Sequence, residues 1–81
     1  MRGHPDNNKA LAELIEQNPA LTPMRLSEIT GFAYGTAYGW TVKPRNKNFK
    51  VMPHVAIRLL RLELGLARPA YRQWWKLRLA A

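Results

Sequence analysis

The chain has 81 residues, enough for one compact domain around one hydrophobic core. Thirteen Lys and Arg against five Asp and Glu give a formal net charge of +8, a balance typical of nucleic-acid-binding proteins. The lack of cysteine excludes disulfides and thiolate metal sites. The sequence also has no apolar run of the roughly 18 residues that a membrane-spanning helix needs, so no membrane partner is expected.

The first eight residues are polar, which predicts a flexible N-terminal arm over residues 1–8. They lack the apolar stretch of a signal peptide, so we expect a cytoplasmic protein. Residues 9–66 then form the expected domain. Its first helix is indicated by the helical spacing of Leu11, Leu14 and Ile15, with a cap from Asp6, Asn7 or Asn8, and it ends before Pro19.

Two short helices are predicted next, separated by a tight turn. Thr22 can cap the first of them and Pro23 suits its first position, while Gly31 can adopt the positive φ that ends it. The following helix runs from about residue 33 or 34 to residue 42, where Pro44 stops it. Residues 45–50 form a polar, basic loop.

A fourth helix is expected to open at Met52-Pro53 and to end at Gly65. Its predicted apolar face comprises Val55, Ala56, Leu59 and Leu60, widened by Ile57 and Leu64.

The sequence of residues 67–81 is basic and Trp-rich, and it predicts a fifth helix over about residues 70–79. We expect it to pack on the domain or to form a dimer interface through Tyr71, Trp74 and Trp75. The prediction is therefore an all-α, single-domain bundle of about five short helices.

The spacing between residues 26 and 40 indicates a helix-turn-helix. Ser27 is small where the second helix must pass close, Gly31 makes the turn, and Ala37 faces inward where the helices meet. The expected core beneath them consists of Leu26, Ile29, Phe32 and Trp40.

This pattern resembles the phage repressor and Cro-like (XRE-type) helix-turn-helix family over residues 10 to about 64. The matching positions are Leu26-Ser27, Ile29, Gly31-Phe32, Thr36-Ala37 and Trp40, followed by a helix with Pro53 and Val55 to Leu60. The resemblance implies a homodimeric, sequence-specific transcriptional regulator that binds double-stranded DNA. It further implies a phage or prophage repressor that acts by occupying its operator.

Three features depart from the family pattern. Ala33 stands where the family usually has a Ser or Thr cap, and no acidic residue follows Trp40. Gly35 and Gly39 lie inside the expected recognition helix, where each costs about 1 kcal/mol relative to Ala. We interpret these glycines as allowing close approach of the helix to the DNA groove.

Two sets of residues are the predicted DNA contacts. The groove-facing set supplies hydroxyls and little bulk: Tyr34, Gly35, Thr36, Tyr38, Gly39 and Thr41. The phosphate-contacting set is basic and follows at once: Lys43, Arg45, Lys47 and Lys50.

Two other functions are compatible with the sequence. One is an excision or recombination accessory factor that bends DNA. The other is an interaction protein that captures a host regulator through Tyr34 and Tyr38 or through Trp74 and Trp75. An enzyme is not expected, because two histidines, no cysteine and five scattered acidic residues offer no catalytic or metal-binding pattern. No cofactor is predicted.

Overall fold

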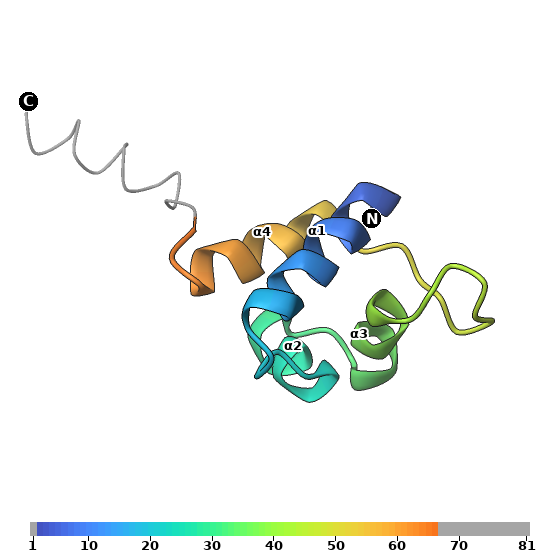
Figure 1. Ribbon diagram of the computed structural model, residues 1–81, viewed down its shortest axis with the longest axis horizontal. Coiled ribbons are helices and arrows are strands. Elements are labelled where there is room, and N and C mark those ends of the chain that lie inside the picture. Colours follow the sequence, from blue (N-terminus) through green and yellow to red (C-terminus); the bar gives the residue numbers. More distant parts are fainter. Residues whose placement is uncertain (1, 67–81) are drawn as a thin grey trace, which may run out of the picture.

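The computed structural model describes residues 2–66, which fold into four helices and no strand (Figure 1). These are α1 (Pro5–Gln17), α2 (Pro23–Thr30), α3 (Tyr34–Thr41) and α4 (His54–Glu63). The all-α prediction is therefore confirmed. The fifth helix predicted over residues 70–79, including Tyr71, Trp74 and Trp75, lies outside the described residues. None of the helices within 2–66 is long and apolar enough to cross a membrane.

The helices enclose one core. Helix α1 packs on α3 and α4, and α2 packs on the same two helices, with α2 and α3 on the lower side in Figure 1. Every helix contributes to the buried cluster, whose members are Leu11, Leu14, Leu21, Leu26, Ala37, Trp40, Met52, Ala56, Ile57 and Leu60. Trp40 is the largest side chain among them and is only 2% exposed, so its predicted core position is confirmed.

The turn between α2 and α3 lies over this core. Ile29 and Phe32 are partly buried against it, in agreement with the predicted packing. The rings of Phe32 and Trp40 meet edge to face, with centroids 5.2 Å apart. This geometry is favourable for two aromatic rings and fixes the turn against α3.

Helix ends follow the local signals in the sequence. The Thr22 side chain accepts from the N–H of Arg25 at 3.3 Å, and Pro23 occupies the first turn of α2. Gly31 has φ of 77°, the left-handed conformation in which L side chains are strained. Ala33 caps α3 without a side-chain hydrogen bond. The short α3 therefore depends on tertiary packing, since a helix of this length is marginal alone.

The predicted apolar face of α4 is partly wrong. Ala56, Ile57 and Leu60 are buried, whereas Val55 is 43% and Leu59 is 37% exposed. Both sets of residues have helical spacing, so the sequence pattern does not separate them. The position of α4 against α1 and α2 decides which set faces the core.

The described part of the arm predicted over residues 1–8 differs from that prediction. Residues 5–8 form the first turn of α1, and the cap is His4, whose Nδ1 accepts from the N–H of Asp6 at 3.0 Å. Asn7 and Asn8, predicted as caps, instead make contacts far along the chain. The N–H of His54 donates to the carbonyl of Arg2 at 3.0 Å, so the chain is held from its second residue.

Candidate functional site

The connection between α2 and α3 is held by side-chain hydroxyls as well as by Gly31. The hydroxyl of Ser27 donates to the carbonyl of Phe32 at 2.6 Å, and that of Thr30 accepts from the N–H of Phe32 at 3.4 Å. The sequence indicated Ser27 only as a small residue, and its hydrogen bond was not predicted. These contacts fix where α3 starts relative to α2.

Helix α3 exposes one uncharged stripe. Tyr34 is 53% and Tyr38 is 38% exposed, and Thr41 lies on the same side because the three are spaced by four and three residues. Gly35 adjoins this stripe, and no atom lies within 4 Å of the Cβ that a side chain would add there. Four of the six predicted groove-facing residues therefore share one accessible surface, which we call the α3 stripe: Tyr34, Gly35, Tyr38 and Thr41.

The other two residues of that predicted set are placed differently. Thr36 is half-buried, and Gly39 is buried. A Cβ at Gly39 would lie 2.6 Å from the carbonyl oxygen of Asn48 and 2.9 Å from Cγ of Lys50. The close approach that Gly39 allows is therefore to the chain's own loop, which corrects the interpretation of Gly39 as a groove-facing residue.

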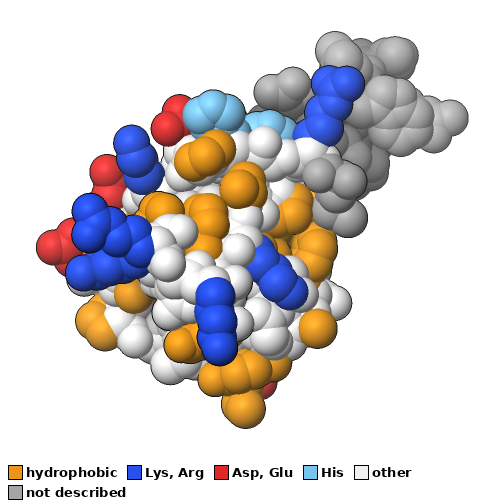
Figure 2. Space-filling model, turned by 90° about the vertical axis from the view of Figure 1, so that its right-hand side faces the viewer, with side chains coloured by type: hydrophobic (Ala, Val, Ile, Leu, Met, Phe, Trp, Pro, Cys, Tyr) orange, Lys and Arg blue, Asp and Glu red, His pale blue; other side chains and the backbone are white. Residues whose placement is uncertain are grey.

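The segment after α3 folds back on that helix. The N–H of Lys50 donates to the carbonyl of Gly39 at 2.9 Å, and two turns between residues 43 and 49 shape the loop. Its basic side chains are all exposed; they are Lys43, Arg45, Lys47 and Lys50. Figure 2 shows Lys and Arg side chains spread over this side of the molecule, with acidic side chains only at its margins.

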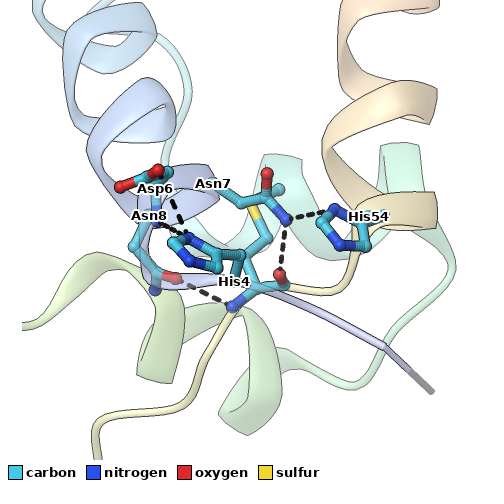
Figure 3. Close-up of polar contacts among 6 residues, drawn as sticks. His4, Asp6, Asn7, Asn8 and His54 are labelled. Atoms are coloured by element: carbon cyan, nitrogen blue, oxygen red, sulfur yellow. Dashed lines mark hydrogen bonds and ion pairs between the residues drawn. The ribbon is translucent and has the colours of Figure 1, made fainter.

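One amide holds both ends of this loop. Nδ2 of Asn8 donates to the carbonyls of Trp40 at 3.1 Å and Lys50 at 2.9 Å. Its Oδ1 accepts from the N–H of Met52 at 2.9 Å (Figure 3). Beside it, Nδ2 of Asn7 donates to the carbonyl of Met52 and contacts Nδ1 of His54. The basic loop is thus tied to the end of α3 through the first turn of α1.

We expect Asn8→Ala to lower the free energy of unfolding by about 2 kcal/mol, because three backbone groups lose their partner. Urea unfolding followed by circular dichroism measures the change. The matched control is Asn48→Ala, since the Asn48 side chain is exposed and makes no hydrogen bond within residues 2–66. If Asn8→Ala lowered the free energy of unfolding no more than the control does, Asn8 would not hold the two ends of the loop.

The two helical glycines provide a second comparison. Gly35→Ala should raise the free energy of unfolding by up to about 1 kcal/mol, because Ala favours the helix and the added methyl meets open space. Gly39→Ala should lower it, since the loop backbone at Asn48 must move. Thermal and urea unfolding of both variants measure these opposite signs. Stabilisation of the protein by both substitutions would refute the tight contact between loop and helix.

Charges are unevenly distributed along the chain. No Asp or Glu occurs between Glu28 and Glu63, a stretch that includes α3, the loop and nearly all of α4. The basic residues in that stretch are Lys43, Arg45, Lys47, Lys50, Arg58 and Arg61. The acidic residues of the described chain lie on α1, on α2 and at the last position of α4. The α3 stripe and the loop therefore form a positive, acid-free surface.

An apolar groove of about 260 Å³ lies between α1 and the segment that follows α3. Its walls include Ala12, Ile15, Val42 and Phe49, with Lys9 and Lys43 among the few polar residues. No histidine or carboxylate lines it, so it offers no group for general acid–base chemistry at neutral pH. Within residues 2–66, no cluster of His, Asp and Glu is able to hold a metal ion.

A comparison with known protein families found no match, and neither did comparisons with curated proteins and with solved structures.

Proposed function

We propose that the chain is a helix-turn-helix protein that binds double-stranded DNA, with α2 and α3 as the two helices of the motif and α3 in the major groove. The observation that carries this proposal is the accessible, uncharged α3 stripe directly beside a basic loop. An α-helix fits the major groove, which is about 12 Å wide. At about 1.5 Å per residue, the eight residues of α3 span about 12 Å.

The loop has the properties needed for phosphate contacts. Its four cations are exposed, and the hydrogen bonds of Asn8 and Gly39 hold its backbone against the end of α3. Cations on a fixed backbone contact phosphates at lower entropic cost than cations on a free segment, since less conformational freedom is lost on binding. Such contacts position the protein on the duplex without selecting a sequence.

The α3 stripe limits the direct readout of bases. It has no Arg, Asn or Gln, the residues that make bidentate contacts with guanine or adenine. The hydroxyl of Thr41 donates to the carbonyl of Tyr38 at 2.8 Å, so its proton is used in a hydrogen bond within α3. Tyr34 and Tyr38 remain as hydroxyl donors, and the Thr41 methyl suits contact with a thymine methyl. We therefore expect strong backbone binding with moderate sequence preference.

The resemblance of residues 10–64 to phage repressor and Cro-like proteins supports a regulatory role. We propose a dimeric transcriptional repressor of phage or prophage origin, located in the cytoplasm, that acts by occupying an operator. An excision or recombination factor would share the DNA-binding surface and differ by bending several adjacent sites.

Binding to a pool of duplex DNA, at low and physiological salt, tests this function. The pool includes the segment upstream of the chain's own gene. We expect retention of a subset of sequences, with an affinity that falls steeply as salt rises because phosphate contacts release counterions. No binding at low salt by a folded sample would exclude the proposal.

Exposed aromatic residues on α3 favour one further candidate, an interaction protein for a host regulator. Tyr34 and Tyr38 together expose large rings with no charged residue between them, as in protein interfaces. Tyr34→Ala and Tyr38→Ala would then abolish partner capture while DNA affinity stayed unchanged. Loss of DNA affinity in the same variants would favour the DNA-binding function.

A further inference from the structure

Helix α4 has a second apolar face, directed away from the core. Val55 is 43% and Leu59 is 37% exposed, Leu62 is partly exposed, and Leu66, just beyond the helix, is 60% exposed. The residues are spaced by four, three and four positions, so Val55, Leu59 and Leu62 line one side of the helix. We call these four residues the α4 outer stripe. No helix within residues 2–66 covers it.

The chain turns sharply at the end of this stripe. The N–H of Leu66 donates to the carbonyl of Arg61 at 2.8 Å, and the N–H of Gly65 donates to the carbonyl of Leu62 at 3.1 Å. With φ of 73° at Gly65, these bonds form a Schellman motif, which ends a helix and redirects the chain. Helix α4 therefore ends at Glu63, and the chain changes direction at Gly65 and Leu66, at one end of the α4 outer stripe.

We propose that residues 67–81 of the same chain, the C-terminal segment, dock on the α4 outer stripe as an antiparallel partner of α4. Counted from Leu66, the apolar residues of α4 lie four, seven and eleven positions before it: Leu62, Leu59 and Val55. Those of the segment lie five, eight, nine and eleven positions after it: Tyr71, Trp74, Trp75 and Leu77. A short link between two helices makes them antiparallel neighbours, so these matching distances pair the two apolar sets.

The size of the stripe favours this occupant over a second copy. The stripe consists of four side chains on or just beyond the ten-residue α4. A stable interface between separate proteins buries about 800 Å² of accessible surface on each partner and involves about 20–30 residues a side. A tethered segment needs far less, because the link supplies a high effective concentration. Docking would also remove the exposed side chains of Leu59 and Leu66 from water.

Introduced cysteines test this placement, since the chain has none of its own. The variant pair Leu59→Cys with Trp75→Cys is oxidised in the full chain at low protein concentration and analysed by non-reducing electrophoresis. We expect an intramolecular disulfide, because the two positions face each other in the docked arrangement. The control pair is Lys47→Cys with Trp75→Cys, which joins the segment to the exposed loop and should form at least tenfold more slowly.

Two results of this experiment would overturn the proposal. Equal rates for both pairs would mean that the segment has no preferred site. Disulfide-linked dimers in place of monomers for the Leu59 pair would assign the stripe to a second copy of the chain. Neither result depends on DNA binding, so the proposed function is tested separately.

Tryptophan fluorescence provides a measurement that needs no covalent bond. Leu59→Glu should shift the emission to longer wavelength and raise quenching by acrylamide about twofold, since Trp74 and Trp75 lose their cover while Trp40 stays buried. The matched control is Val51→Glu, a similarly exposed residue outside α4 that should leave both signals unchanged. An unchanged signal for Leu59→Glu, or equal changes in both variants, would contradict docking.

Discussion

Gly35→Glu is expected to abolish specific DNA binding while the protein stays folded. The substitution adds bulk and a negative charge at the centre of the α3 stripe, where it would face phosphates and base edges. Juxtaposed like charges cost several kcal/mol, which corresponds to at least about a 100-fold loss of affinity. The fold should tolerate the change, because no atom lies within 4 Å of the new Cβ. Fluorescence anisotropy with the selected duplex measures the loss, and circular dichroism checks the fold.

Two variants separate the causes of this effect. Gln17→Glu adds the same charge at the exposed end of α1 and should reduce affinity by less than about threefold, since exposed charges far from DNA are screened. Gly35→Gln adds similar bulk without charge, so its DNA affinity should lie between those of Gly35→Glu and Gln17→Glu. Unchanged binding by folded Gly35→Glu would refute the placement of α3 in the groove.

Neutralising the basic loop is expected to produce the second large effect. The variant carries Gln in place of Lys43, Arg45, Lys47 and Lys50. Each phosphate contact contributes about 0.9 to the slope of log K against log salt, so losing four lowers the slope by about 3.6. At 0.15 M salt this corresponds to about a 1,000-fold loss of affinity. Titrations of one duplex over a series of salt concentrations measure both quantities.

A pair of doubly substituted variants controls for net charge. Lys47→Gln with Lys50→Gln and Arg58→Gln with Arg61→Gln remove the same charge from exposed positions, the first pair in the loop and the second on α4. We expect the loop pair to lower the salt slope by about 1.8 and the α4 pair to change it much less. Equal effects of the two pairs would show that overall charge, and not the loop, drives binding.

The hydrogen bonds of Asn8 hold the basic loop in the position that these binding predictions assume. The Asn8 side chain joins the last turn of α3 to Lys50 and Met52, the residues on either side of Val51, so the loop cations keep their position relative to the α3 stripe. Both Asn8 and Ser27 act through hydrogen bonds that a side-chain pattern does not reveal. Neither residue was among the predicted site residues, although both hold segments that belong to the site.

Apart from the start of α1, the helix boundaries were predictable from the sequence to within a residue or two, because local stereochemistry sets them. Proline at residue 19 excludes the α conformation before it, Thr22 caps with its own hydroxyl, and Gly31 adopts a positive φ. The exposure of the α3 stripe and of the loop cations follows from the same pattern, since the buried Ala37 and Trp40 fix which side of α3 faces inward.

The tertiary structure decided what depends on contacts between distant residues. Asn8 and Met52 are 44 positions apart in the sequence. The residues near Asn8 therefore do not indicate that its amide binds the loop and does not cap α1. Gly39 is buried because that loop returns to it, and Val55 and Leu59 are exposed because α1 and α2 cover the other apolar side of α4. Backbone chemistry sets where each helix begins and ends, whereas packing between helices selects the side that is buried.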